Sequence, residues 1–312
     1  MDISIILPAF NEEESIEELV LWIEKTLNSS SLKYNIYFVD DGSTDRTWEN
    51  IQKMHTKFSF VKGIRFRRNY GKSAALHTAF HVCDGDVVIT MDADLQDSPE
   101  EILGLYKMIK DDGYDLVSGW KKKRYDNTLT KNLPSKLYNG ITGWMSGVKL
   151  HDMNCGLKAY RKNVIKSIEV YGEMHRYIPV IAKWAGFNNI GEKIVQHQAR
   201  KYGHSKFGMD RFLNGFLDLS TIMFIGKFGK RPMHFFGFLG VLFFFFGLCF
   251  VAYLFFTKYA FGVYGIAERP AFYIALVMMI IGSQMFMTGF IAELISRNAP
   301  ERNHYQIEDR ID

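Results

Sequence analysis

The sequence predicts an α/β domain with a mostly parallel sheet, followed by two helices that span a membrane. Up to residue 120, short β-branched runs alternate with helical patterns, which is typical of a parallel sheet with helices on both faces. Beyond residue 231, two long segments carry no charge. The length of 312 residues favours two domains, or one domain with an appendage.

Each strand of the predicted sheet is a short run of β-branched or aromatic residues. The five strands are expected at 3–7, 36–39, 61–66, 87–91 and 116–118. The first three helices are expected at 12–27, 44–57 and 73–82. A fourth should begin at 97–101, where a capping residue, a proline and early acids occur together. Ligands of such sheets bind at the carboxyl ends of the strands, where acids follow the second and fourth strands.

The two uncharged segments run from 232 to 257 and from 270 to 292. Roughly 20 apolar residues suffice to cross the hydrocarbon core. A buried hairpin of core helices is the alternative, but 235–256 has no polar face, which favours membrane spans. Basic residues flank the outer ends of the pair: Lys227, Lys230, Arg231, Arg297 and Arg302. The positive-inside rule therefore predicts that both large ends of the chain lie in the cytoplasm, and the lack of a basic, signal-like start agrees with this.

Charge and cysteine content exclude some function classes. The net charge of +4 is too small and too dispersed to suggest nucleic-acid binding. The one basic run, 121–124, is typical of a solvated loop. The three cysteines have no metal-ligand spacing, and they indicate reduced thiols in a cytosolic domain and a membrane span.

Asp92 and Asp94 follow the fourth predicted strand directly. Two carboxylates at this spacing place several oxygens near one point, and Mg²⁺ or Mn²⁺ takes such ligands and shares them with substrate phosphates. The same pattern is also common in loops that bind nothing. Its position after an apolar strand, with no lysine or arginine nearby to neutralise it, favours a metal site.

Two further turns follow the first and second strands, at 8–12 and 39–45. Capping of the next helix explains Asn11, Ser43 and Thr44. It explains the pair Asp40 and Asp41 less well, because adjacent acids repel each other and cap only one helix. Carboxylates at a strand end can instead accept hydrogen bonds from a base or from ribose hydroxyls.

The succession of 8–12, 40–45 and 92–99 closely resembles the family 2 glycosyltransferases, which have the Rossmann-like GT-A fold. Within them the chain is similar to the polyprenyl-phosphate glycosyltransferases, the group of dolichol-phosphate mannose synthase and the bacterial undecaprenyl-phosphate glucosyltransferases. The resemblance covers essentially the whole chain, including the paired C-terminal spans. Taken together, the motifs are highly specific, although only the Asp92–Asp94 block is strong by itself.

The resemblance implies a role for each matching position. The nucleotide pocket would be lined by Pro8, Asn11, Glu12, Asp40 and Asp41. The metal and diphosphate would be held by Asp92, Asp94 and Gln96. The sugar and acceptor side would contain Asp152, Arg176, Arg200 and Lys206. The segment from Arg200 to Lys206 also has an independent interpretation as a cationic loop that binds an anion, against the alternatives of a solvated basic face or a contact to anionic lipid.

The resemblance also implies a domain plan and partners. We expect a cytoplasmic GT-A domain at 1–205, an interfacial amphipathic segment at 206–231, a membrane hairpin at 232–296 and a cytoplasmic tail at 297–312. For 206–231 a core helix is a fair alternative. The chain would be an inner-membrane protein, and the subgroup suggests a homotetramer.

The expected reaction is one in-line displacement at the anomeric carbon with inversion, from a nucleotide-sugar to undecaprenyl phosphate. A phosphate monoester is largely dianionic at neutral pH, so it needs positioning by cations more than a general base. Asp152 is therefore expected to orient the sugar or acceptor. Resemblance favours UDP-glucose over GDP-mannose as the donor.

Two other functions remain open. A processive polysaccharide synthase would carry a Gln-x-x-Arg-Trp motif, but the nearest stretch, 196–201, has no tryptophan and the wrong spacing. A non-catalytic membrane scaffold would have no need for the acids at 92 and 94.

Overall fold

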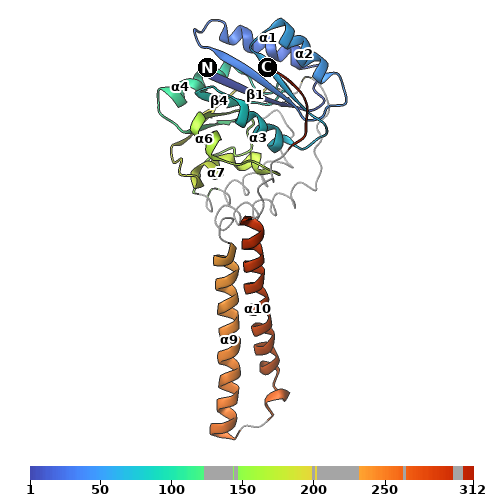
Figure 1. Ribbon diagram of the computed structural model, residues 1–312. Helices are drawn as coiled ribbons and strands as arrows, with labels where there is room; N and C mark the ends of the chain where they lie inside the picture. The colour runs from blue at the N-terminus through green and yellow to red at the C-terminus, as the bar shows by residue number, and fades with distance from the viewer. Residues whose placement is uncertain (123–142, 144–146, 199–200, 202–231, 263–264, 298–304) are drawn as a thin grey trace. The chain divides into compact units, whose positions relative to one another are not determined.

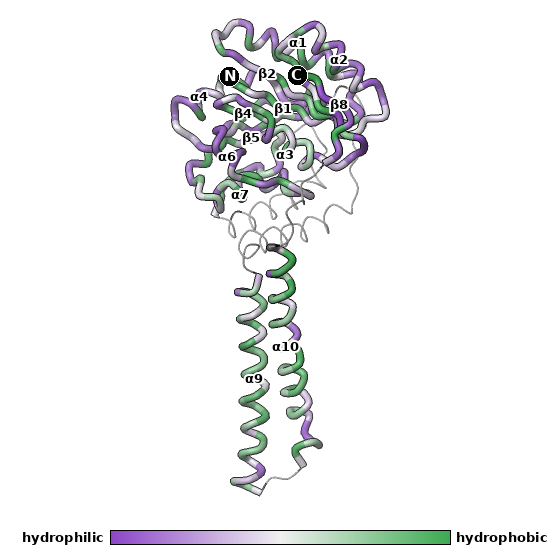
Figure 2. Tube along the Cα trace, viewed as in Figure 1, coloured by the Kyte–Doolittle hydropathy of each residue, from purple (hydrophilic) through white to green (hydrophobic). Residues whose placement is uncertain are grey.

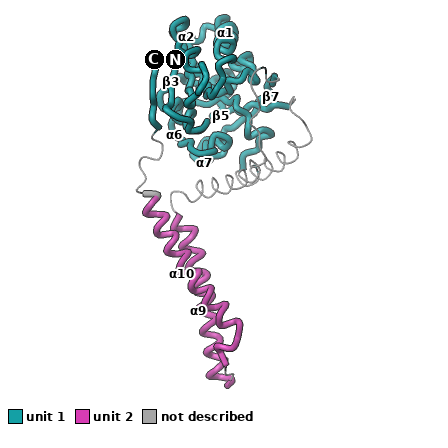
Figure 3. Tube along the Cα trace, turned by 90° about the vertical axis from the view of Figure 1, so that its right-hand side faces the viewer, with its two compact units in different colours: residues 1–219, 303–312 teal, residues 220–302 magenta. Residues whose placement is uncertain are grey.

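The computed structural model describes residues 1–122, 143, 147–198, 201, 232–262, 265–297 and 305–312. The chain forms two compact units (Figure 3), Met1–Leu219 with Asn303–Asp312, and Ser220–Arg302. We call the first the catalytic unit and the second the membrane hairpin, and we describe each by itself.

The catalytic unit contains an eight-stranded sheet with the order β7-β5-β6-β4-β1-β2-β3-β8 among the described residues. Its centre is the predicted parallel set, β1 (Ile3–Ala9), β2 (Tyr34–Asp40), β3 (Val61–Phe66) and β4 (Val87–Thr90). The predicted fifth strand is β5 (Leu116–Trp120). These strands are buried along most of their length, as expected of parallel strands covered on both faces. The predicted fold class is confirmed.

Three strands were not predicted. β6 (Lys158–Arg161) is antiparallel to both β4 and β5, and β7 (Ile190–Ile194) is parallel to β5. β8 (Ile307–Ile311) is antiparallel to β3 at the opposite edge. All three strands are short and carry charged residues, so none gives an apolar run to detect. β7 and β8 lie at the sheet edges, where charged residues are common, whereas β6 lies between β4 and β5. β8 lies within 297–312, which the sequence predicted to be a tail.

Helices cover both faces of the sheet (Figure 1). α1 (Ile16–Leu27), α2 (Thr47–Lys57) and α4 (Ile102–Lys110) share one core cluster with alternate residues of β1. α3 (Lys72–Val82) contacts β1 and β2, and α6 (Lys162–Ser167) contacts α3. The short helix η1 (Pro99–Glu101) leads into α4, which confirms the predicted helix start. Two further short helices among the described residues of the unit are η2 (Met174–Tyr177) and α7 (Ile178–Trp184).

α1 illustrates why these segments are helical. Its buried residues are Ile16, Leu19, Val20, Ile23 and Leu27, the spacing of one apolar stripe facing a core. Acids occupy the first turn and a lysine the last, which suits the helix dipole.

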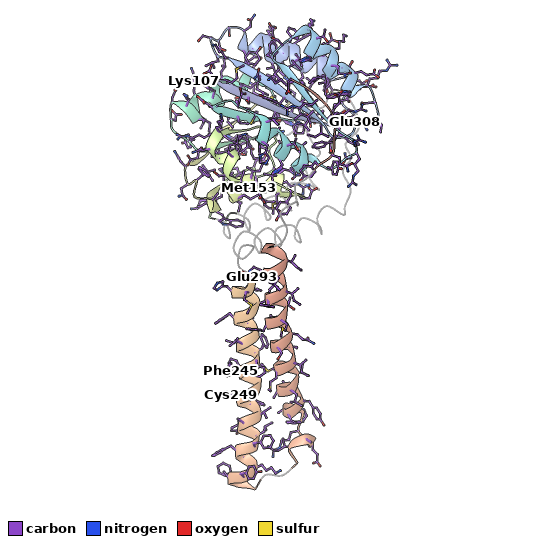
Figure 4. All side chains as sticks on the ribbon, in the orientation of Figure 1. Lys107, Met153, Phe245, Cys249, Glu293 and Glu308 are labelled. Atoms are coloured by element: carbon purple, nitrogen blue, oxygen red, sulfur yellow. The ribbon has the colours of Figure 1, made fainter. Side chains whose placement is uncertain are left out.

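The membrane hairpin consists of α9 (Pro232–Phe261) and α10 (Pro270–Arg297), with a short η3 (Ile266–Glu268) between them. Both long helices are apolar enough to cross a membrane, and only 17% of the most apolar window of each is buried. Figure 2 shows hydrophobic residues along most of both helices, and Figure 4 marks Phe245 and Cys249 on α9, both exposed. A core helix of a soluble protein would bury such residues, so the spanning interpretation is favoured.

Glycines bring α9 and α10 together. A Cβ added at Gly240 would lie 2.6 Å from the carbonyl oxygen of Gly282. One added at Gly247 would lie 2.6 Å from the carbonyl oxygen of Ala275. The two backbones are therefore in direct contact, as small residues permit in membrane helix pairs.

Candidate functional site

The carboxyl ends of the central strands meet at one edge of the sheet. Ala9 of β1 is in register with Asp40 of β2, and Ile6 is in register with Thr90 at the end of β4. The loops that follow these strands therefore lie side by side. The sequence predicts this edge as the site, from the acids that follow the second and fourth strands.

The loop after β4 is held by its own acids. The Asp94 Oδ1 accepts a hydrogen bond from the Gln96 amide at 3.2 Å, and the Asp97 Oδ2 accepts one from the Asp92 amide at 3.3 Å. Leu95, between them, has a φ of 61°. A left-handed leucine costs about 1–2 kcal/mol, and such strain gathers at functional sites. The predicted metal-binding residues therefore lie in one strained, internally bonded loop.

Lysines lie close to this loop, contrary to the sequence prediction. Lys72 Nζ forms an ion pair with the Asp92 carboxylate, and Lys121 Nζ lies 2.8 Å from Asp97 Oδ1. Burial alone would raise the pKa of Asp92, but Lys72 and Lys121 outweigh it and hold that pKa well below its usual range. The prediction of an unneutralised acidic pair was wrong because Lys72 reaches Asp92 from another element. Lys121, predicted to be solvated, has a side chain only 13% exposed.

Lys72 is a charged residue of this edge that the sequence analysis did not single out; Lys158 is another. Lys72 begins α3 directly after Gly71, whose φ is +92°. A cation in the first turn of a helix opposes the helix dipole, and the ion pair with Asp92 offsets this cost. That unfavourable position was the available signal in the sequence.

The segment from Asp152 to Gly156 lies against Asp92. A Cβ at Gly156 would lie 2.6 Å from Asp92 Oδ2, so only glycine lets this backbone approach the carboxylate. Asp152 is buried, and its Oδ1 accepts a hydrogen bond from the Asn154 amide at 3.2 Å. Its own amide donates to Glu192 Oε1 at 3.1 Å. The structure thus brings the predicted sugar-side segment beside the predicted metal ligand.

A cavity of about 20 Å³, room for about one water, lies beside this segment. Its lining is part polar and part apolar, and its charged side chains include Lys72, Lys158 and Arg176. Lys158 is 3% exposed and donates to the Cys155 carbonyl. Burial lowers its pKa. Among the described residues, no carboxylate lies within ion-pair distance of Lys158. Burying positive charge is costly, so an anion beside Lys72, Lys158 and Arg176 would be stabilised here.

Arg176 joins this cavity because η2 is attached to the start of α3. The His175 amide donates to Ser73 Oγ at 3.0 Å. Burial, with Lys72 and Arg176 nearby, lowers the pKa of His175 well below 6.5, which leaves the imidazole neutral at neutral pH. Arg176 Nη2 lies 2.9 Å from Glu173 Oε2. The predicted acceptor-side arginine therefore lies in the same cavity as Lys72.

The loops after β1 and β2 are interlocked by short polar side chains. The backbone N–H of Asn11 donates to Ser43 Oγ at 2.9 Å, and the side-chain Oδ1 of Asn11 accepts from the backbone N–H of Thr44 at 2.9 Å. The Glu12 amide donates to Thr47 Oγ1 at 2.8 Å. Pro8 lies within β1. The structural interpretation of Asn11 and Ser43 is supported, and nucleotide contact by Pro8, Asn11 and Glu12 stays a prediction.

The two adjacent acids at the end of β2, Asp40 and Asp41, bind different partners. Asp40 Oδ1 accepts from the Ser43 amide at 2.9 Å, and its Oδ2 lies 3.5 Å from Arg65 Nε. Asp41 accepts from the amides of Tyr70 and Gly71 at 2.7 and 2.9 Å. Both carboxyls are buried, and burial raises the pKa of each. Asp41 therefore holds the turn that leads into Lys72.

Two predicted site residues, Arg200 and Lys206, lie outside the described residues, as does the predicted interfacial segment 206–231. The chain that leads to Arg200 is described. The Gln198 amide donates to the Gln96 carbonyl at 2.9 Å, and His197 forms a β-bridge with Asp97. The approach to Arg200 thus runs beside the loop that carries the predicted metal ligands.

The acids at this edge fit a hard divalent cation shared with a substrate. Asp92 and Asp94 supply only oxygen donors, and Asp92 already holds a positive charge, the Lys72 ammonium. Within the part of the chain that the structure describes, no group of three His, Cys, Asp or Glu side chains could hold a metal alone. A cation here would therefore need further ligands from a phosphate, as Mg²⁺ commonly does.

Comparisons with known proteins agree with this site. The model of the family described as glycosyl transferase family 2 matches residues 4–169. A dodecaprenyl-phosphate galacturonate synthase of Rhizobium johnstonii is 36% identical, over 95% of this chain and 88% of that protein. An undecaprenyl-phosphate 4-deoxy-4-formamido-L-arabinose transferase of Pseudomonas syringae is 32% identical, over 95% and 86%.

Solved structures support the fold. Glucosyl-3-phosphoglycerate synthase of Mycobacterium tuberculosis, in complex with UDP, superposes with a TM-score of 0.54 at 19% identity, over 72% of this chain and 79% of that one. A complex of the same enzyme with Mn²⁺, UDP-glucose and phosphoglyceric acid gives 0.53 at 18% identity, over the same shares. The fold, the site and the full-length relatives lead to one conclusion: this chain belongs to glycosyltransferase family 2, among the polyprenyl-phosphate sugar transferases.

Proposed function

We propose that the chain transfers one sugar from a nucleoside-diphosphate donor to a polyprenyl phosphate, with inversion at the anomeric carbon. The observation that carries this proposal is the meeting of two unlike groups of side chains at Gly156. One group is the carboxylates of the Asp92 loop, and the other is the cations Lys158 and Arg176 in the adjoining cavity. The first suits a donor diphosphate with its cation, and the second suits an anionic acceptor.

In this mechanism, an acceptor phosphate oxygen forms the new bond to the anomeric carbon. The bond from that carbon to the donor diphosphate breaks, and its electron pair leaves with the diphosphate. The acceptor is already largely dianionic at neutral pH, so no base need remove a proton. Lys158 and Arg176 position its oxygens. Asp152, fixed by Asn154, orients the sugar or the acceptor rather than abstracting a proton.

Asp92, Asp94 and Gln96 are the residues that would hold Mg²⁺ or Mn²⁺ with the donor. When bound, the cation would stabilise the negative charge that develops on the leaving diphosphate. Lys72 has its own part in this scheme. Its ammonium neutralises Asp92 in the absence of donor and, once released, becomes a contact for a donor phosphate. Arg200 and Lys206 are proposed to complete the phosphate contacts, which the course of 197–198 beside Gln96 supports.

The membrane hairpin would bring the active site to the lipid. β8 follows α10 and pairs with β3, which precedes α9, so both ends of the hairpin connect to the same folded unit. A two-span hairpin then places both termini on one side of the membrane, and the flanking basic residues favour the cytoplasmic side of the inner membrane. We further propose that 206–231 lies at the interface, and that the chain assembles as a homotetramer.

The sugar is the least determined part of the proposal. Resemblance favoured UDP-glucose, but the relatives named above act with galacturonate and with a formamido-arabinose. We therefore propose a UDP-sugar donor and leave the choice among UDP-glucose, UDP-galacturonate and UDP-4-deoxy-4-formamido-L-arabinose to experiment.

A donor screen tests the proposal. Purified full-length protein is incubated with undecaprenyl phosphate, Mg²⁺ or Mn²⁺ and each UDP-sugar in turn. The mass of the lipid product is then measured by mass spectrometry. We expect one donor to give a lipid with a single added sugar. Successive additions of sugar would instead indicate a polysaccharide synthase. No transfer from any of these donors, nor from a GDP-sugar added to the screen, would favour the scaffold. In the same assay, near-normal turnover of Arg176→Ala with complete loss in Asp152→Asn would contradict the role given to Asp152.

A further inference from the structure

The C-terminal segment 305–312 folds into the catalytic unit although the membrane hairpin precedes it in sequence. Its strand β8 extends the sheet beyond β3, with Ile64 opposite Arg310 and Arg65 opposite Asp309. Ile311 packs against the core of the unit. These contacts make the segment an integral part of the domain, and they place it against the strand that leads toward the predicted nucleotide pocket.

One arginine connects this segment to the pocket. Arg65 Nε lies 3.5 Å from Asp40 Oδ2 and 3.5 Å from Glu308 Oε2. Asp40 is fully buried, whereas the Glu308 side chain, marked in Figure 4, is 46% exposed. Neither Asp40 Oδ2 nor Arg65 Nε has a hydrogen-bond partner among the described residues. The guanidinium is therefore shared between Asp40, a predicted nucleotide-site acid, and Glu308 of β8.

An aromatic contact connects the segment to the turn after β3. The ring of Tyr305 lies 5.8 Å from that of Phe66, 5.5 Å from that of Tyr70 and 6.1 Å from the imidazole of His77, between centroids. The Arg67 amide also donates to the carbonyl of Gln306 at 3.2 Å. The turn from Arg67 to Gly71 is thus held on one side by the C-terminal segment.

The other side of the same turn carries the site. The amides of Tyr70 and Gly71 bind Asp41, and the next residue, Lys72, pairs with Asp92. Without Tyr305 this turn would gain conformational freedom, which donor binding would then have to remove. The contacts thus run from Tyr305 to Asp41 and Lys72, and from Glu308 to Asp40.

We propose that segment 305–312 is a positioning element of the donor pocket, which fixes Asp40 through Arg65 and fixes the turn before Lys72 through Tyr305. The inference rests on the proposed function, because it takes Asp40, Asp41 and Lys72 as donor-binding residues. It follows that a donor pocket of full affinity requires the chain beyond the membrane hairpin. Tyr305 and Glu308 act through other residues and need not touch the donor.

The test measures binding of UDP with Mn²⁺ to full-length protein by calorimetry, together with steady-state kinetics. For Tyr305→Ala we expect UDP affinity to fall by about 5–10-fold, since ring contacts of this kind each contribute on the order of 0.5–1.5 kcal/mol. Tyr305→Phe, which keeps the ring, should restore most of it. Glu308→Gln should weaken UDP binding by about 2–5-fold, as one partly exposed ion pair suggests. The KM for the donor should rise in both Tyr305→Ala and Glu308→Gln, with the KM for polyprenyl phosphate unchanged.

The matched control is Arg310→Gln, on the same strand. Arg310 Nε bonds Asp312 at 2.8 Å on an exposed surface, so this change should leave UDP affinity unaltered. If Tyr305→Ala and Glu308→Gln bind UDP as well as Arg310→Gln does, the inference is wrong and the proposed function is untouched. If the unchanged protein does not bind UDP with Mn²⁺, the proposed UDP donor fails first, and the inference falls with it. If Tyr305→Ala does not fold, the comparison of Glu308→Gln with Arg310→Gln still decides.

Discussion

The catalytic unit and the membrane hairpin use the same apolar residue types in opposite ways. In the catalytic unit Ile3, Ile5 and Leu7 have no exposed surface, whereas Phe238 and Phe256 of α9 are 68% and 62% exposed. Burial from water drives the first arrangement, and lipid removes the need for it in the second. The comparison shows that hydrophobic residues are not always interior residues. Whether they are buried or exposed depends on whether water or lipid surrounds the unit.

The glycines of the two units also serve different purposes. Gly156 allows a backbone to approach the carboxylate of Asp92, while Gly240 and Gly282 allow two helix backbones to touch. One close approach shapes a reaction site and the other holds two helices together. Substitution should therefore impair chemistry at Gly156 and stability at Gly282.

Gly156→Ala should give the largest loss of activity. The added methyl group would lie 2.6 Å from Asp92 Oδ2, so the carboxylate must move, and a misplacement of about 1 Å can cost ~100-fold in rate. We expect kcat/KM to fall by about that factor with an unchanged melting temperature. Gly104→Ala is the control, because its methyl group would meet only the flexible end of Lys193. Equal activity of the two variants would contradict the account of Gly156.

Lys72→Gln removes the positive charge of this side chain in the catalytic unit but keeps a polar side chain at the position. Loss of the ammonium removes a charged contact to the donor, which should lower kcat/KM by about 10–100-fold, the value of roughly 1.5–3 kcal/mol for a charged hydrogen bond. The same change removes the cation that competes for Asp92, so Mn²⁺ should bind the donor-free protein more tightly. Calorimetry with Mn²⁺ alone measures this. Weaker Mn²⁺ binding in Lys72→Gln would show that Lys72 does not compete for Asp92.

Gly282→Leu tests the membrane hairpin. Its side chain would collide with the carbonyl of Gly240, and overpacking of this kind costs about 1–3 kcal/mol. We expect less folded protein and a lower melting temperature in detergent, with UDP affinity per folded molecule retained. Ile280→Leu, on the exposed face of α10, should change neither. A selective loss of UDP affinity in Gly282→Leu would contradict the claim that this glycine serves the stability of the hairpin and not the donor site.

The smallest effect concerns pH. Burial, with the neighbouring His81, lowers the pKa of His77 below 6.5. The unfolded chain then binds its proton at higher pH than the folded chain, so stability is fullest above pH 6.5 and falls as the solution is acidified. The slope from this group is at most about 1.4 kcal/mol per pH unit. Melting temperatures between pH 8 and 5.5 should fall less for His77→Leu than for the unchanged protein. Parallel curves would exclude His77 as the cause.

The central sheet could be predicted because β1 to β4 are apolar runs between turn residues, and the bounds of β3 were predicted residue by residue. β6, β7 and β8 could not, because their charged side chains carry no signal of burial. In the site, the acids at 40, 41, 92 and 94 were identifiable from their positions after strands. Their partners were not, since Lys72 and Arg65 reach them across the fold.

The most direct test of the central claim is release of nucleoside diphosphate on addition of undecaprenyl phosphate, with the full-length protein, Mn²⁺ and the donor found by the screen. We predict release in equal amount to a lipid carrying one sugar, and loss of both by at least about 100-fold in Asp92→Asn, since a single charge-stabilising group is worth that much. Release that does not depend on the lipid, or an Asp92→Asn protein that still makes the glycolipid at the normal rate, would contradict the account.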